Sequence, residues 1–358
     1  MATTTSYPGV YLSEEAVSNF VVSSAATAVP AFAFRKYAWE PSHDGNIFVF
    51  NNWAEFLKGQ HGNEGEFTYA VSIKLWFMNG GGKCYLFQKS YLDELLNKYD
   101  DITLVVAAGT ETDIFNQITN FSNRSGYQVF HLLDSANSKI GPADTQSTIM
   151  TNYPVLANAA VFYPWGKSQL GNDIPPSAMA AAAIAQADST LGVWKAPANL
   201  IINGVASLKY PVSDDLQGRF NQGKALNMFR EYPGSGVILW GARTLEDSDN
   251  WRYIPVRRLF NMIETDVRRS LNKVVFETNN PPTWQRVKSA LNNYLYSLWQ
   301  QGALVGNSPQ EAWFVEVGKG ITMTEGDINQ GKLIINLGLA AVRPAEFILL
   351  QFSQDIAQ

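Results

Sequence analysis

Hydrophobic positions in the first hundred residues come in short runs that turn-forming residues separate. The runs Phe32–Phe34, Ile47–Phe50 and Cys84–Gln88 are rich in aromatic or β-branched side chains, which is typical of strands. The stretches Trp53–Lys58 and Tyr69–Met78 have the apolar spacing of helices. Two strands, two helices and a third strand are therefore predicted, in that order, in this part of the chain.

Further strands and a helix are predicted up to residue 165. Ile102–Ala107, Val129–Leu133 and Ala159–Tyr163 are apolar runs of strand length, and Asp113–Asn120 has a helical pattern. This order of elements favours an α/β fold.

An alanine-rich stretch follows, "IPPSAMAAAAIAQADSTLGVWKAPAN", residues 174–199. It predicts a helix over 177–188, with Pro175 and Pro176 before it and Ser177 as its N-cap. Small side chains would let this helix approach a sheet closely. Trp194 is interpreted as a packing anchor, with a ligand clamp as the alternative.

The last third of the chain carries longer helical patterns. Val256–Asn272 has its apolar residues on one face, and Thr283–Gln301 is bounded by helix start and stop signals. Gly236–Gly241 precedes them as a predicted strand. Lys332–Gly338 and Glu346–Phe352 are predicted β segments at the end of the chain.

The first 25 residues contain no Lys or Arg and favour extended backbone over helix. A single short strand is not stable without neighbours. The pattern therefore leaves two possibilities open: this segment pairs with the body of its own chain or with another molecule.

Composition narrows the class of protein. Of the 358 residues, 46% are hydrophobic, so a sizeable core is expected. The formal charge of −5 argues against nucleic acid as a partner, because phosphate contacts need a basic surface. Cys84 is the only cysteine, which excludes an intrachain disulfide. The apolar run Phe20–Phe34 lacks a basic region before it and is interrupted by Pro30, so neither a secretory signal nor direct membrane insertion is expected.

The sequence contains no complete catalytic or ligand-binding motif. Residues 79–84, "NGGGKC", lack the spacing and the final Ser or Thr of a phosphate loop, and a glycine turn is favoured, although Lys83 beside the alanine helix leaves a nucleotide-binding rival. His43, His61 and His131 are far apart without metal-ligand spacing. Residues 246–249 lack the glycine and glutamate of a calcium loop. No enzyme, cofactor or metal site is predicted.

One charged segment stands out in this acidic protein. Residues 251–273 contain six cations and two carboxylates, a local charge of +4. The pattern fits either a solvated helix face or a protein interface that attracts an acidic neighbour.

Seven blocks, taken together and in order along nearly the whole chain, resemble the contractile tail sheath family of phages and related injection machines. The chain lacks the length for the extra surface domains of larger phage sheaths. It is therefore most similar to sheaths of extracellular injection systems of the antifeeding-prophage type, with R-type bacteriocin sheaths nearly as good a match. The blocks are "YPGVY" at 7–11, "FMNGGGKCYLF" at 77–87, residues 174–199, "GARTLEDSDNWRYIPVRRLFNMIE" at 241–264, "VFETNNPPTW" at 275–284, "LWQQGALVG" at 298–306 and "RPAEFILLQFSQ" at 343–354.

The resemblance implies an α/β fold with α+β character, in which mixed sheets packed with helices form the core and extended arms leave both ends. The expected units are an N-terminal arm at 1–25, the N-terminal part of the core at 26–100, an α/β core at 101–250, a C-terminal sheath domain at 251–343 and a C-terminal arm at 344–358.

It also implies contacts. The arms would add strands to sheets of neighbouring subunits, through segments 17–23 and 347–354, with flexible connections near 24–27 and 338–344. The basic segment, or the helix Thr283–Gln301, would face the inner tube or the next layer. The expected arm residues are Val17, Phe20, Val21, Val22, Phe347, Ile348, Leu350 and Phe352, and the expected tube or inter-layer contacts are Arg257, Arg258, Arg268, Arg269 and Lys273.

The implied function is a structural sheath subunit that polymerises helically around an inner tube and contracts without a nucleotide. Implied partners are further copies of the chain, the inner tube, baseplate and terminator proteins, and paralogous sheath proteins. The protein would be made in the bacterial cytoplasm and then join a phage tail or a released particle. A tube-associated or terminator protein is the alternative.

Overall fold

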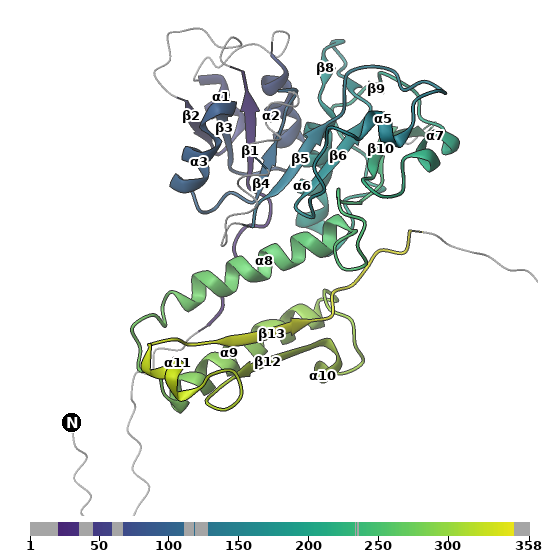
Figure 1. Cartoon of the computed structure of the whole chain (residues 1–358). Coiled ribbons are helices and arrows are strands. Elements are labelled where there is room, and N and C mark those ends of the chain that lie inside the picture. Colours follow the sequence, from purple (N-terminus) through teal and green to yellow (C-terminus); the bar gives the residue numbers. More distant parts are fainter. Residues whose placement is uncertain are drawn as a thin grey trace, which may run out of the picture.

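The computed structural model describes residues 21–35, 46–58, 67–110, 118, 128–232, 234 and 236–346. These residues form two lobes, which the long helix α8 (Ile254–Leu271) joins (Figure 1). The upper lobe contains an eight-stranded sheet, and the lower lobe contains two long helices and a two-stranded sheet.

The large sheet has the strand order β11-β10-β6-β5-β4-β1-β3-β2. Its six inner strands are parallel, and the edge strands β2 and β11 are antiparallel to their neighbours. Residues before and after position 100 thus share one sheet. The strands are β1 (Pro30–Phe34), β2 (Ile47–Phe50), β3 (Cys84–Gln88), β4 (Leu104–Val106), β5 (Phe130–Asp134), β6 (Ala159–Tyr163), β10 (Leu226–Tyr232) and β11 (Gly236–Trp240).

Both faces of this sheet are covered, as parallel sheets require. Phe32 and Val106 point into the cluster under α2 and α6, whereas Ala31 and Val105 point into the cluster on the opposite face. The helices of the upper lobe are α1 (Trp53–Lys58), α2 (Thr68–Met78), α3 (Leu92–Lys98), α5 (Gln146–Ile149), α6 (Pro176–Thr190) and α7 (Asp214–Arg219). A small sheet consists of β7 (Gly166–Lys167), β8 (Asp173–Ile174) and β9 (Ser207–Leu208).

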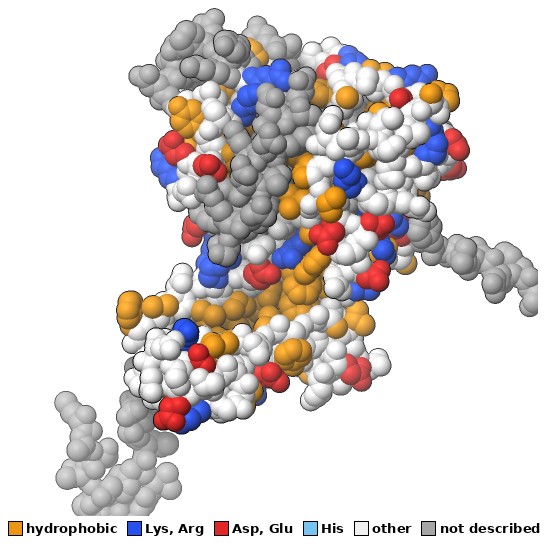
Figure 2. Space-filling model, in the orientation of Figure 1, with side chains coloured by type: hydrophobic (Ala, Val, Ile, Leu, Met, Phe, Trp, Pro, Cys, Tyr) orange, Lys and Arg blue, Asp and Glu red, His pale blue; other side chains and the backbone are white. Residues whose placement is uncertain are grey.

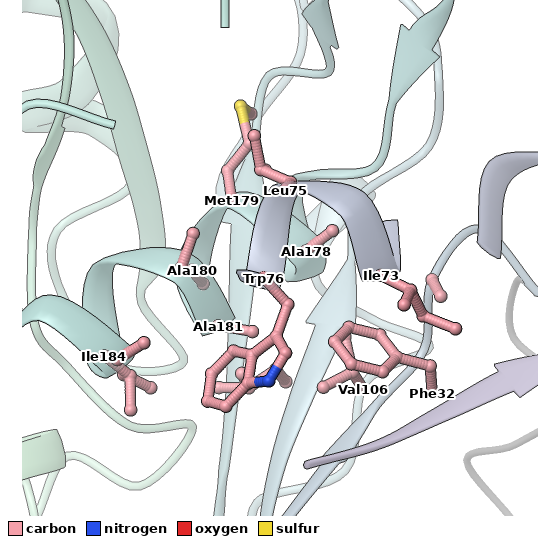
Figure 3. Close-up of a cluster of buried hydrophobic side chains, with 14 of the residues drawn as sticks. Phe32, Ile73, Leu75, Trp76, Val106, Ala178, Met179, Ala180, Ala181 and Ile184 are labelled. Atoms are coloured by element: carbon pink, nitrogen blue, oxygen red, sulfur yellow. The ribbon is translucent and has the colours of Figure 1, made fainter. Parts of the chain in front are cut away.

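The alanine stretch is the helix α6, and it is buried nearly all round. Its small side chains let α2 lie close beside it, and the large ring of Trp76 fills the remaining space together with Phe32 and Val106 (Figure 3). The prediction of close helix-on-sheet packing is confirmed. Ser177 as N-cap is wrong, because the helix begins one residue earlier and Pro175 occupies the N-cap position.

The lower lobe packs α8 and α9 (Pro281–Gln300) against the hairpin β12–β13. α8 belongs to both lobes: Ile254 lies in the upper core, and Leu259 and Ile263 lie in the lower one. The smaller elements of this lobe are α10 (Pro309–Ala312), β12 (Trp313–Val317), α11 (Glu325–Asn329) and β13 (Ile335–Leu339).

The α/β fold with additional α+β character, in the form of mixed sheets packed with helices, is confirmed. The predicted segments 113–120 and 346–352 lie almost entirely outside the described residues. Sequence reasoning missed β10 and β12. β12 could have been found, because "WFVEV" is rich in aromatic and β-branched residues, which are typical of strands.

Candidate functional site

The carboxyl ends of β4 and β5 meet the start of α6, where many α/β proteins hold an anionic ligand. Here the chain's own Asp134 takes that position. Its two carboxylate oxygens accept hydrogen bonds from the backbone N–H groups of Ser177 and Gly109, each at 2.7 Å. Burial raises the pKa of Asp134 to about 6. An internal carboxylate therefore satisfies the donors that a bound phosphate would use.

This buried carboxyl predicts a specific pH dependence. Its folded-state pKa lies above the ordinary 3.8, so the folded chain holds the proton more tightly than the unfolded chain. The stabilising contribution is complete below about pH 4 and is lost as the pH rises through about 6. The variant Asp134→Asn lacks this titration. The wild type should therefore lose about 3 kcal/mol of its free energy of unfolding, relative to Asp134→Asn, as the pH rises between those limits. Urea titrations at several pH values measure it, and a pH-independent difference would contradict the assignment.

The glycine-rich turn near Lys83 is a packing feature. Gly80 has φ +83°, and a Cβ on Gly81 would lie 2.2 Å from the ring of Trp76. The Trp76 indole N–H donates to the Gly82 carbonyl at 2.8 Å. Lys83 itself pairs with Asp101 at 2.7 Å. The turn interpretation is confirmed, and Lys83 is engaged in an ion pair.

Other candidate chemistry is also internal. His131 is fully buried, and desolvation lowers its pKa to about 3. His43 and His61 lie outside the described residues. Within the described ranges, no three His, Cys, Asp or Glu side chains gather as a metal site would require. Burial raises the pKa of the Cys84 thiol well above its usual range. None of the helices described is both long and apolar enough to cross a membrane.

Two arginines of the predicted tube or inter-layer contact, Arg257 and Arg258, are instead buried within the subunit. The side chain of Arg258 is 4% exposed and that of Asp188 on α6 is 5% exposed; their ion pair measures 2.7 Å. Arg258 also donates to the carbonyl of Thr27 at 3.1 Å, and the Thr27 hydroxyl donates to Asp188 at 2.6 Å. The three residues join the N-terminal segment, the upper lobe and α8.

Arg257 is likewise enclosed. Its guanidinium lies 4.2 Å from the ring centre of Trp251 and donates to Asn261 at 2.7 Å and Glu264 at 3.1 Å. Burial lowers its pKa. The local pattern fits either a solvated helix face or a protein interface, and packing around α8 instead encloses this arginine within the subunit.

The other three cations of the predicted contact lie toward the end of α8. Arg268 and Lys273 are exposed, and Arg269 is partly exposed and donates to the backbone carbonyl of Asp100 at 2.6 Å. A contact with an inner tube or a neighbouring layer stays a prediction for these three.

The chain enters the lower lobe through a fixed N-terminal connection. The N–H of Ala25 donates to Asp266 at 2.9 Å, and the hydroxyl of Tyr294 donates to the same carboxylate at 2.7 Å. Val22 is buried in the lower core, whereas Val21 is 62% exposed. The connection at 24–27 was predicted to be flexible, but a pivot there would have to break these bonds and those of Thr27.

The C-terminal connection is fixed in a similar way. Glu346 receives three hydrogen bonds of 2.6–3.0 Å from the guanidinium of Arg243, and the Tyr253 hydroxyl lies 3.4 Å from it. Ala340 and Val342 are bonded to the body of the lobe. The flexible connection predicted at 338–344 is therefore also tied down. The arm residues Val17, Phe20, Phe347, Ile348, Leu350 and Phe352 lie outside the described residues.

Among the described residues, the hairpin β12–β13 has an edge without a partner strand. Ala340 directs both its N–H and its C=O toward the β12 side, to Ala312 and Val305. Successive residues of a strand point in opposite directions, so Leu337 and Leu339 direct their backbone groups to the other edge. In the part of the chain that the structure describes, β13 pairs with β12 alone in its sheet.

An apolar surface borders this edge. Hydrophobic side chains run along the lower lobe in Figure 2. Met262 and Leu271 of α8 and Ile335, Leu337 and Leu339 of β13 pack against the lower core and are only partly buried. The apolar surface and the edge together offer hydrophobic contacts and backbone hydrogen bonds to an extended segment.

Comparison with known proteins decides the family. The model of the phage tail sheath protein central domain matches residues 94–245, and that of the phage tail sheath C-terminal domain matches residues 246–355. The chain belongs to the phage tail sheath family. The tail sheath protein of Enterobacteria phage T4 is 31% identical over 127 residues, which are 34% of this chain; the chain spans about a fifth (19%) of that protein.

Solved structures match this sheath protein over its whole length. It is 45% identical to a chain of the PVC sheath complex, an extracellular contractile injection system in the contracted state, with a TM-score of 0.90 over 99% of each chain. It is 57% identical to a chain of the anti-feeding prophage baseplate in the contracted state, with a TM-score of 0.90 over 98% of this chain and 100% of that one. It is 40% identical to a chain of the helical sheath of the anti-feeding prophage in the contracted state, with a TM-score of 0.83 over 98% of this chain and 100% of that one. Its fold is that of a contractile sheath subunit.

Proposed function

We propose that this sheath subunit polymerises into a helical tube whose copies are linked by strand addition at the free edge of β13. The segment that adds comes from a terminal arm of a neighbouring copy. The observation that carries the proposal is the edge of β13 that has no partner strand among the described residues, beside partly buried apolar side chains. A strand of about five residues would supply several backbone hydrogen bonds, each worth about 1 kcal/mol net. Two arms per subunit in a lattice add avidity to this modest gain.

The fixed connections fit this role. The arms would transmit force only if their roots are firmly joined to the body, and the bonds of Ala25, Thr27 and Glu346 provide such joints. Contraction then follows from two packings of the same subunits that differ by a few kcal/mol each, summed over the tube. A baseplate is an expected partner, because the similar solved chains come from helical sheath and baseplate assemblies. An inner tube and a terminator are further expected partners of the proposed tube. The complete machine is a phage tail or an extracellular particle.

Leu337→Pro tests the edge directly. Proline removes the N–H that points away from β12, so it should leave the hairpin paired but prevent a further strand from bonding. We expect no sheath tubes in electron micrographs, while circular dichroism shows a folded chain.

Leu337→Ala is the matched control, because it loses the same leucine side chain but keeps the N–H. It should still assemble, with a free energy of unfolding lower by about 2 kcal/mol. Normal tubes from Leu337→Pro would contradict strand addition at β13. A proline variant that fails to fold is distinguished from one that fails to assemble by the dichroism spectrum.

A further inference from the structure

The connection between α8 and α9 exposes a large apolar side chain to solvent and holds its backbone in a strained conformation. Val274 is buried, but Val275 is 56% exposed and Phe276 is fully exposed. The N–H of Glu277 donates to the Val274 carbonyl at 3.0 Å, which closes a turn with Phe276 at its third position. Phe276 has φ +72°, a conformation that glycine adopts freely and a bulky residue rarely does. Both the exposed ring and the backbone are unfavourable in the isolated subunit.

The turn is held rigidly, so the ring projects from a defined place. Val274 lies in the lower core below it, Glu277 pairs with Arg286 of α9, and Asn279 donates to the Lys332 carbonyl at 2.9 Å. Backbone strain at an ordered position points to a function. We call Val275 and Phe276 the knob.

A cleft of complementary character lies elsewhere on the chain. It has a volume of about 580 Å³, and its lining includes Ala196, Ala198, Trp240 and Tyr253 together with Asp214 and Glu346. A dry cavity of about 150 Å³ already holds a benzene molecule, so the cleft has ample room for one phenyl ring. Trp240, which is 40% exposed, offers an aromatic face.

The knob and the cleft stand at opposite ends of α8. Tyr253 of the cleft immediately precedes this helix, and three residues separate the end of the helix from the knob. Eighteen helical residues span about 27 Å, so the knob of one copy does not reach its own cleft. A contact between them must therefore join two copies, and because the two surfaces differ it builds either a ring or an open helical array.

We infer that the knob of each subunit docks into the cleft of a neighbouring copy of the same chain in the assembled sheath. The inference rests on the proposed function, because it adds a second contact to the same lattice. The ring then exchanges water for the apolar lining of the cleft, which offsets the local penalty of its backbone conformation. The N-terminal arm and the knob would both extend to neighbouring copies from the lower lobe, because Ala25 is bonded to Asp266 on α8.

The variant pair Phe276→Gly and Phe276→Tyr separates assembly from folding. Glycine removes the ring and relieves the backbone, so we expect an unchanged or higher unfolding midpoint but at least a tenfold higher protein concentration for tube formation. Tyrosine keeps both the ring and the strained backbone, and it should assemble like the wild type.

A cross-link identifies the acceptor. Phe276→Cys combined with Ala198→Cys should join neighbouring copies in assembled tubes when a short bismaleimide is added, giving a ladder of multimers under denaturing conditions. Phe276→Cys with Val155→Cys, an exposed position (69%) that does not line the cleft, should give none. Cys84 is buried and does not compete.

The outcomes are distinct. A ladder that is specific to the Ala198 pair, together with the assembly defect of Phe276→Gly, supports the contact. If Phe276→Gly forms tubes at the same protein concentration as the wild type, the contact is wrong but the proposed function stands. The same holds if the Phe276→Cys and Ala198→Cys protein forms tubes that give no cross-linked ladder. A wild-type chain that forms no tubes with its inner tube contradicts the proposed function and this contact with it.

Discussion

A chain that lacks residues 1–20 should remain a folded monomer and should build no sheath. The boundary of the deletion follows from the structure: Val22 is part of the lower core and Ala25 is bonded to Asp266, so both must be kept. Residues before them are expected to serve a neighbouring copy, and their loss removes one link per subunit from every position of the lattice.

Size-exclusion chromatography, circular dichroism and negative-stain microscopy measure this outcome together. We expect the dichroism spectrum and unfolding midpoint of the full chain, with no tubes. The informative control deletes residues 1–25, which also removes the core residue Val22 and the bonded Ala25, and should lower the unfolding midpoint. Normal tubes from the shorter deletion would show that the N-terminal arm is not a link.

Arg258→Ala should have the largest effect on stability of any single substitution in the basic segment. It would leave the carboxylate of Asp188, which is 5% exposed, without its ion-pair partner, and would also remove the donor to the Thr27 carbonyl. Breaking a buried pair on one side costs about 3–5 kcal/mol. Arg268→Ala, at an exposed position of the same helix, should change the free energy of unfolding by no more than about 0.5 kcal/mol.

A double-mutant cycle makes the test quantitative. Arg258→Met combined with Asp188→Leu replaces the pair with apolar side chains of similar length, so it should cost clearly less than the sum of the two single substitutions. Denaturant titration of all four proteins gives the coupling energy. A cost below about 1 kcal/mol for Arg258→Ala would mean that the pair does not hold the lobes together.

Local patterns predicted most of the elements that form the upper core. The runs at Cys84–Gln88 and Ala159–Tyr163 were found with the bounds that the structure has, because a strand buried on both faces is a continuous apolar run. β10, Leu226–Tyr232, was missed because it includes Asn227, Arg230 and Glu231. Its neighbour β6 and Arg243, which exchanges hydrogen bonds with Asn227, decide its structure, and such partners are not visible in a local window.

The arginines show a different limit. A helical pattern reports which residues share a face, but it does not report that a second lobe covers the polar face. Arg257 and Arg258 are buried because α8 passes between the lobes, where Asn261 and Asp188 provide their partners. The partner of Arg258 is 70 residues away in sequence, and no spacing rule connects them. The knob was visible only as part of the block "VFETNNPPTW", since exposure and backbone angle are properties of the fold.

The central claim is that copies of this chain are linked through the free edge of β13. Helical reconstruction by electron cryomicroscopy of tubes assembled from the full chain with its inner tube tests it most directly. The account predicts an extended segment of a neighbouring copy that bonds to the outward backbone groups of Leu337 and Leu339. A resolved lattice in which that edge remains unpaired would contradict it.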